Sequence, residues 1–266
     1  MIKIIFSDMD GTLLDENSQL PAEFDEVMAE LKKRNVIFAP TSGRQYFALT
    51  YQLAKYKDDF MFLAENGTLT YYKGQELFSN TIDKGEFYKV LEKAMELDTI
   101  YPVISGKKGS YIQRKWEPWI SELDKYYTHF TYVDSFYDID DEFIKLALAD
   151  NDGEDAEHSI YKPMQNIHSN LSVTLSSNIW VDLMSPTANK GWAVKKVQEI
   201  MGFKPEECAC FGDYLNDYEM MSTVHYSYAM ANAHPKLKEV AHFQCKSNAE
   251  HGVMEQIKQF IKDGLI

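Results

Sequence analysis

The sequence predicts an α/β protein with a core built on a parallel sheet and a second, α+β domain inserted into that core. Two observations predict the core: apolar segments of strand length alternate with amphipathic segments up to residue 64, and the same alternation returns from residue 190. A third observation predicts the insert, because the alternation is lost between residues 84 and 187. Residues 81–187 also carry −9 of the net charge of −14, so they form a compositionally distinct block.

The first core segment shows helical and strand periodicities in turn. Phe24 begins a series of apolar residues at i, i+3, i+4 and i+7, which form one face of a helix, and Pro21 suits the first turn of that helix. Further on, Asn66-Gly67 and Lys73-Gly74 surround a short alternating stretch, so we expect a hairpin there instead of another strand and helix. The other expected elements are strands at 2–7, 36–40 and 60–64 and helices at 21–34 and 45–56.

The insert mixes helical and β-type segments irregularly, and the parallel pattern then resumes and completes the sheet. The elements expected in the insert are helices at 84–97, 116–127 and 153–165 and strands at 100–104, 110–113, 130–133, 142–149, 171–175 and 179–184. The elements expected after it are helices at 190–201, 215–222, 235–240 and 253–263 and strands at 208–212 and 225–230.

Composition argues against several classes of protein. The longest apolar runs are far shorter than the ~20 residues that span a bilayer, and no basic leader is present, so we expect a cytoplasmic protein without a membrane partner. The net charge of −14 argues against a nucleic-acid partner.

Cys208, Cys210 and Cys245 form no disulfide framework, and we interpret them as core thiols in preference to metal or redox groups. Oligomeric state is not readable from the sequence.

Asp8 and Asp10 follow the first apolar strand in the segment "DMDGT". Residues two apart in an extended segment point the same way, and open α/β sheets bind ligands at this carboxyl edge. A divalent cation would relieve the repulsion between the two carboxylates, and one could then act as nucleophile and the other as general acid/base. The alternative is a polar turn after an edge strand.

Two further segments could bind an anion. "TSGRQ" follows the second strand and opens a predicted helix, so the Ser42 hydroxyl and nearby backbone N–H groups could hold a phosphate; the alternative is that Ser42 merely caps the helix. "NKGWAV" places Lys190 near the start of a helix, where a cation opposes the helix dipole and a bound anion would offset it. The alternative is a solvated surface lysine.

A second acidic cluster follows the strand at 208–212, in "GDYLND". Helical spacing would bring Asp213, Asn216 and Asp217 toward one face. The alternative is an acidic first turn that complements the helix dipole. Two acidic strand ends from opposite halves of one parallel sheet favour a shared site.

The segments "DMDGTLL", "SGR", "NKG" and "GDYLND" resemble, in order and position, the four motifs of the haloacid dehalogenase superfamily. The resemblance is closest to the Cof-type branch of sugar-phosphate phosphatases. It implies a three-layer, Rossmann-like catalytic core at 1–83 and 188–266 and an α+β cap of the C2 type at 84–187. "AMANAHPKLKEVAH" and "SNAEHGVMEQI" also resemble that branch, except that Ala231 stands where members usually carry glycine.

The resemblance assigns the chemistry to the acidic motifs. Asp8 would be the nucleophile that forms an aspartyl-phosphate, and Asp10 would be the general acid/base. Mg²⁺ would be held by the carboxylates of Asp8 and Asp213 and by the backbone carbonyl of Asp10. The implied activity is a magnesium-dependent phosphatase acting on small phosphorylated metabolites, particularly sugar phosphates. A phosphosugar mutase of the same superfamily and a non-catalytic metabolite-binding protein remain alternatives.

The resemblance assigns the remaining positions to the phosphoryl group and its surroundings. Ser42, the Gly43 amide and Lys190 would grip the phosphoryl oxygens. Asn216 would orient the phosphoryl group or the lysine, and Asp217 would act near the metal through water. Arg44 would be either a structural residue or a residue on the substrate side.

The cap would exclude water from the site and read the leaving group. Candidate segments are "KWEPW", "KKGSY" and the regions of His129 and His168. For each of them the alternative of an ordinary core or surface residue is preferred.

Overall fold

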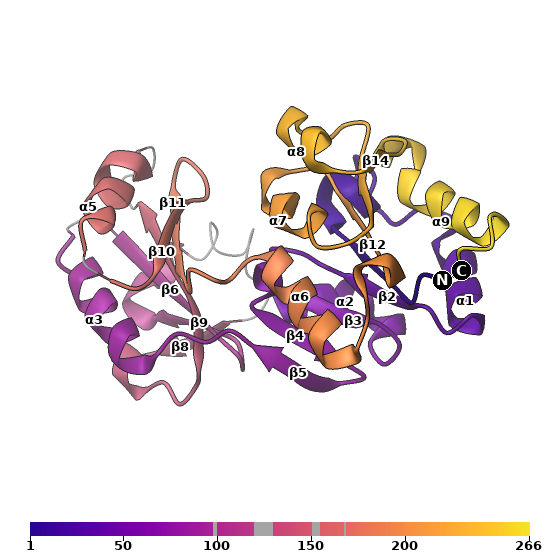
Figure 1. Cartoon of the computed structure of the whole chain (residues 1–266). Coiled ribbons are helices and arrows are strands. Elements are labelled where there is room, and N and C mark those ends of the chain that lie inside the picture. Colours follow the sequence, from indigo (N-terminus) through magenta and orange to yellow (C-terminus); the bar gives the residue numbers. More distant parts are fainter. Residues whose placement is uncertain (98–99, 120–129, 151–154, 168) are drawn as a thin grey trace. The chain divides into compact units, whose positions relative to one another are not determined.

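The computed structural model describes residues 1–97, 100–119, 130–150, 155–167 and 169–266, with no account of the side chains of 117–119 (Figure 1). The chain forms two compact units. One unit contains residues 1–79 and 189–266, and the other contains residues 80–188.

The first unit is built on a five-stranded parallel sheet in the order β14-β13-β12-β1-β2. Its strands are β1 (Ile4–Ser7), β2 (Ile37–Pro40), β12 (Cys208–Gly212), β13 (Tyr226–Ala229) and β14 (Phe243–Gln244). All four residues of β1 are buried, and the strand lies between β12 and β2, so it is a central strand and the alternative of a polar turn after an edge strand is wrong. Because Ser7 is in register with Phe211, the segments that follow β1 and β12 leave the sheet side by side.

Helices cover both sides of this sheet, which confirms the three-layer core. In Figure 1, α1 (Phe24–Lys33) and α9 (Gly252–Lys262) lie on one side, whereas α6 (Lys190–Met201) and α7 (Tyr218–Met221) lie on the other. The unit also contains α2 (Tyr46–Gln52) and α8 (Pro235–Val240). Helix α6 begins where the Asn189 side chain accepts a hydrogen bond from the N–H of Trp192, which fixes the position of Lys190 in the first turn.

The expected hairpin is present beside the parallel sheet. Strands β3 (Met61–Ala64), β4 (Leu69–Tyr72) and β5 (Gln75–Ser79) pair antiparallel, and a parallel bridge between Thr41 and Leu63 joins β3 to the segment after β2. The turn between β3 and β4 approaches α6 so closely that a Cβ atom on Gly67 would lie 2.4 Å from the Cβ of Ala193. Only glycine fits this turn, which also has a positive φ of 84° at Gly67.

The second unit is an α+β domain, as expected. Its six-stranded sheet has the order β10-β11-β9-β6-β7-β8 and is antiparallel except for the pair β7 and β8. Its strands are β6 (Ile100–Gly106), β7 (Ser110–Gln113), β8 (Phe130–Val133), β9 (Phe143–Asp150), β10 (Ser172–Leu175) and β11 (Trp180–Met184). Helices α3 (Lys84–Ala94) and α5 (Lys162–Gln165) pack with one face of the sheet, while an aromatic cluster that includes Tyr101 and Trp180 forms on alternate strand positions.

Several expected helices are shorter than the periodicity predicted. The helix expected at 45–56 ends at Gln52 and is followed by a 3-10 turn, and the helix expected at 215–222 is a 3-10 turn with only the short α7 after it. In the insert, the segment 114–119 is a 3-10 helix and 157–161 is a π-helical turn, whereas residues 120–127 of the helix expected at 116–127 lie outside the described residues. Side chains that bond to nearby backbone N–H groups, as Asp217 does, favour such tight turns over a regular helix.

The three cysteines are free, and Cys208 and Cys210 are buried in β12. Burial raises the pKa of Cys208 to about 11 and that of Cys245 to about 12, so these thiols stay protonated near neutral pH. No helix among the described residues has both the length and the apolar character needed to cross a bilayer.

Candidate active site

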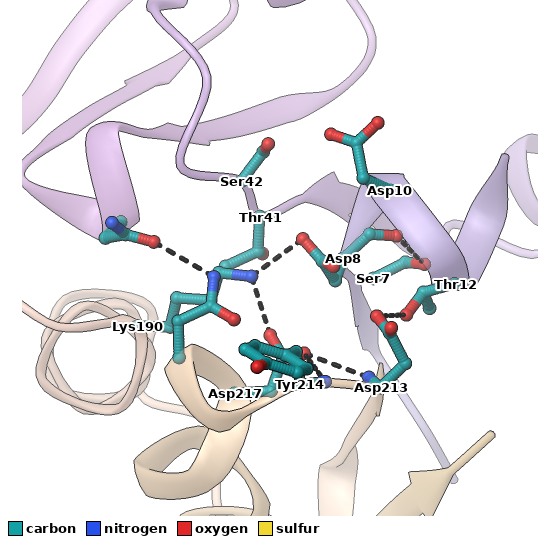
Figure 2. Close-up of polar contacts among 12 residues, drawn as sticks. Ser7, Asp8, Asp10, Thr12, Thr41, Ser42, Lys190, Asp213, Tyr214 and Asp217 are labelled. Atoms are coloured by element: carbon teal, nitrogen blue, oxygen red, sulfur yellow. Dashed lines mark hydrogen bonds and ion pairs between the residues drawn. The ribbon is translucent and has the colours of Figure 1, made fainter. Parts of the chain in front are cut away.

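A buried lysine between two carboxylates lies at the carboxyl edge of the parallel sheet. The Nζ of Lys190 donates to Asp8 Oδ1 over 2.7 Å and to Asp217 Oδ1 over 2.6 Å (Figure 2). Lys190 and Asp217 are fully buried, and Asp8 is 6% exposed. The alternative of a solvated surface lysine is therefore wrong, and the carboxylates offset the unfavourable position of this cation at a helix N-terminus.

Asp213 completes an acidic cluster with these residues. Ligand atoms of Asp8, Asp213 and Asp217 all lie within 4.8 Å of one another. Thr12, which follows Asp10 in the first motif, donates its hydroxyl to Asp213 Oδ1 over 2.8 Å, so the first and fourth motifs are joined directly. Thr12 was not singled out from the sequence. The sequence feature that could have indicated Thr12 is a hydroxyl residue two positions after Asp10, in the turn between the first strand and the next helix.

The cluster carries more negative charge than one lysine neutralises. Burial raises the pKa of Asp8 well above its ordinary value; Lys190 opposes this shift, and the charges of Asp217 and Asp213 add to it. Burial also raises the pKa of Asp213, and the Thr12 hydrogen bond only partly opposes that shift. For Lys190, burial lowers the pKa, but the charges of Asp217 and Asp8 outweigh burial and keep the ammonium group protonated.

The loop that carries Asp10 makes a close approach to the fourth motif. Residues Met9–Leu13 form a π-type turn in which Gly11 has a positive φ of 74°. A Cβ atom on Gly11 would lie 2.4 Å from Asp213 Oδ2. Glycine is therefore required both by the backbone conformation and by the space that Asp213 occupies.

Asp10 and Arg44 form an ion pair beside the cluster. The Arg44 guanidinium donates from Nε to Asp10 Oδ2 over 2.8 Å and from Nη2 to Asp10 Oδ1, and its Nη1 donates to Gln52 Oε1 over 2.8 Å. Asp10 is half-exposed, and Figure 2 shows its carboxylate turned away from Lys190. The carboxylates of Asp8 and Asp10 therefore do not point toward one site, although residues two apart in a strand would. The reason is that the chain leaves the extended conformation in the turn Met9–Leu13.

The segment after β2 carries Ser42 and Gly43 and leads into a helix, as expected. Helix α2 begins at Tyr46 and its N-cap is Gln45, so the alternative of Ser42 as the cap is wrong. Ser42 is buried, its N–H donates to the carbonyl of Leu63, and its Oγ accepts from the N–H of Arg44 over 3.1 Å. This bond holds the Ser42–Arg44 turn at the sheet edge.

Asn216 bonds to a residue outside the acidic cluster. Its Nδ2 donates to Asn66 Oδ1 over 3.2 Å, and Asn66 also lies next to Gly43. The expectation that Asp213, Asn216 and Asp217 share one helical face is wrong, because Asp213 and Tyr214 donate their N–H groups to Asp217 Oδ2 in a tight loop before the helix. Sequence reasoning treated Asn66 only as a turn residue.

A family model described as haloacid dehalogenase-like hydrolase matches residues 5–257. The chain belongs to this family. It is 28% identical over 264 residues to 5-amino-6-(5-phospho-D-ribitylamino)uracil phosphatase YbjI of Escherichia coli (strain K12), covering 98% of this chain and 97% of that protein.

Solved structures agree with this assignment. SMU.1108c from Streptococcus mutans UA159 is 27% identical to this hydrolase with a TM-score of 0.84, covering 98% of this chain and 100% of that one. A protein from Eubacterium rectale is 25% identical with a TM-score of 0.88, covering 97% of this chain and 99% of that one. The predicted family and fold are confirmed, and with them the enzyme class, a phosphoric monoester hydrolase.

The cap segments named from the sequence are held by contacts within their own unit. Trp116 of "KWEPW" packs on Tyr101, with ring centroids 4.2 Å apart. In "KKGSY", the N–H of Lys108 and the hydroxyl of Tyr111 both donate to Asp141 Oδ2. His129 and His168 lie outside the described residues.

Proposed function

We propose that this hydrolase is a Mg²⁺-dependent phosphatase that removes the phosphoryl group from small phosphorylated metabolites, particularly sugar phosphates, through an aspartyl-phosphate at Asp8. One observation carries the proposal: carboxylates from the ends of β1 and β12 converge on one point with the buried Lys190 beside them. We further propose that 1–83 and 188–266 form the catalytic core, that 84–187 act as the cap, and that the enzyme works in the cytoplasm.

The residues of the cluster fit a divalent cation. Burial raises the pKa values of Asp8 and Asp213, and the charge of Asp217 adds to both shifts, so their ionised forms are disfavoured without an added cation. Carboxylate and carbonyl oxygens are the donors that Mg²⁺ prefers. Asp8, Asp213 and the backbone carbonyl of Asp10 would hold it, and it would supply positive charge where an anionic nucleophile meets an anionic phosphate.

The chain's own residues divide the reaction into two displacements. A carboxylate oxygen of Asp8 attacks phosphorus and forms the aspartyl-phosphate, while the bond to the leaving oxygen breaks and Asp10 donates a proton to that oxygen. Asp10 then accepts a proton from water, the water oxygen attacks phosphorus, and Asp8 and inorganic phosphate are released. Lys190, Ser42 and the Gly43 amide would stabilise charge on the phosphoryl oxygens.

Arg44 is proposed as a positioning residue for Asp10, since it bonds to both oxygens of that carboxylate. We expect Arg44→Ala to lower kcat about 10-fold and to leave KM within a few-fold, because the acid/base would lose its fixed orientation. Arg44→Lys should recover little, because an ammonium group cannot make the two-pronged contact. Steady-state kinetics separate the two roles left open by the sequence: an unchanged kcat with a raised KM would make Arg44 a substrate-side residue.

The metal proposal has a readout that needs no substrate. We expect Mg²⁺ to raise the melting temperature of the wild-type protein, because a ligand present at about 100 times its Kd stabilises the folded state by about 2.7 kcal/mol. Asp213→Asn should remove most of this shift, and Asp263→Asn, an exposed acid on the last turn of the chain, should keep it. Equal shifts in all three proteins would argue against Asp213 as a ligand.

The substrate class is tested by phosphate release. Purified protein with Mg²⁺ is assayed against phosphorylated sugars, sugar alcohols, nucleotides and vitamin precursors; the name of the Escherichia coli relative recommends a ribityl phosphate among them. Release of inorganic phosphate from sugar phosphates supports the proposal. Accumulation of an isomeric sugar phosphate without free phosphate would instead identify a mutase, and no turnover of any compound would favour the binding protein.

A further inference from the structure

The loop at 230–234, which follows β13, holds the two catalytic motifs at once. The Nδ2 of Asn232 donates to the carbonyl of Gly11 over 2.8 Å, and the N–H of His234 donates to the carbonyl of Asp213 over 2.8 Å. Gly11 and Asp213 belong to the loops that leave β1 and β12. One short segment therefore bonds both to the loop after β1, called here the nucleophile loop because it carries Asp8, and to the loop after β12, which carries Asp213.

The hydrogen bond from Asn232 to Gly11 is separated from the proposed metal ligand Asp213 by one residue, Thr12. The carbonyl of Gly11 belongs to the peptide that precedes Thr12, and the Thr12 hydroxyl donates to Asp213 Oδ1. A fixed Gly11 carbonyl thus fixes the orientation of that peptide, and with it the direction from which Thr12 reaches Asp213. Gly11 has no side chain that could hold this peptide in place, so the bond from Asn232 constrains it directly.

Asn232 is itself held in place by a second asparagine. Its Oδ1 accepts from the N–H of Asn248 over 3.2 Å, and the Nδ2 of Asn248 donates to the carbonyl of Leu14 over 2.9 Å. Asn248 is only 8% exposed. The side-chain amides of Asn232 and Asn248 therefore donate hydrogen bonds to the nucleophile loop at two points, the carbonyls of Gly11 and Leu14.

We infer that Asn232 is a positioning residue that holds the first and fourth motifs at the separation that Mg²⁺ requires. The inference rests on the proposed function. Replacing residues that orient metal ligands without touching the metal commonly changes metal affinity or activity 10- to 100-fold. Asn232 is exposed, so its replacement removes these two bonds without opening a cavity in the core.

The test replaces Asn232 and measures Mg²⁺ directly. We expect Asn232→Ala to raise the Mg²⁺ concentration that half-saturates the melting-temperature shift by about 10-fold, and to lower kcat by a similar factor with KM for the phosphate ester nearly unchanged. Asn232→Asp keeps the acceptor for Asn248 but loses the donor to Gly11, so it should show the same defect. Lys236→Ala, an exposed change in α8 just after this loop, should behave as wild type.

The outcomes distinguish this inference from the proposed function. If wild-type protein shows no Mg²⁺-dependent shift and no phosphate release, the proposed function has failed. If wild type shows both and the two Asn232 variants match it in half-saturation and kcat, the positioning role is overturned. The same holds if the variants lose melting temperature in EDTA and their Mg²⁺ half-saturation does not change, because that pattern reports a merely structural contact.

Discussion

We expect Asp8→Asn to reduce phosphate release by at least about 1,000-fold while the protein remains folded. The amide cannot form the aspartyl-phosphate, and the rest of the site cannot replace a missing nucleophile. The variant should be at least as stable as wild type in the absence of metal. Burial and the neighbouring acids already disfavour the ionised form of Asp8, so a neutral group of the same shape relieves that cost.

The measurement combines kinetics with intact mass. Phosphate release is followed with Mg²⁺ on the best substrate of the panel, and mass spectrometry of the rapidly quenched enzyme looks for a phosphoryl adduct that the variant lacks. Glu16→Gln, an exposed change in the same N-terminal segment, serves as the matched control and should turn over at the wild-type rate. Undiminished turnover by the Asp8 variant would exclude the covalent mechanism.

Lys190→Met should have the largest effect on stability. The ammonium group is fully buried between Asp8 and Asp217, so its removal leaves two buried carboxylates without a counter-charge. Breaking a buried ion pair from one side costs about 3–5 kcal/mol, and we expect a loss of unfolding free energy in that range together with loss of turnover. Urea unfolding in EDTA measures the first effect, and phosphate release measures the second.

Two further variants show whether charge is the cause. Lys190→Met combined with Asp217→Asn should recover part of the lost unfolding free energy, because one of the unpaired carboxylates is gone. Lys196→Met replaces a half-buried lysine on the same helix, paired with Glu199, and should change stability by less than about 0.5 kcal/mol. A Lys190→Met protein as stable as the Lys196 variant would contradict the interpretation of the cluster.

Part of the site was predictable from the sequence because its signals are local. Asp8 was expected at the end of a buried strand, and the structure places it there, directly after β1. Lys190 was expected at the start of a helix, and it is the first residue of α6. Strand and helix periodicity and the order of four short motifs are properties of neighbouring residues, so a single sequence carries them.

Other parts depended on contacts between distant residues. Nothing near Arg44 in the sequence indicates that its guanidinium pairs with Asp10, and nothing near Asn232 indicates that its amide reaches Gly11. The helix expected at 215–222 is shortened to α7 for a related reason. The Asp217 carboxylate competes for backbone N–H groups and receives a buried lysine from α6, and this tertiary partner favours a tight loop there.

By itself the sequence determined the family, the α/β core with its α+β insert, and the identity of the acidic motifs, because apolar periodicity and motif order are written along the chain. Only the tertiary structure decided which groups meet: that Lys190 is buried between Asp8 and Asp217, that Thr12 joins Asp213, and that Asp10 faces Arg44. The physical reason is that hydrogen bonds and charge pairs act over a few ångströms in space. The parallel pairing of β1 with β12 brings residues about 200 positions apart within that range.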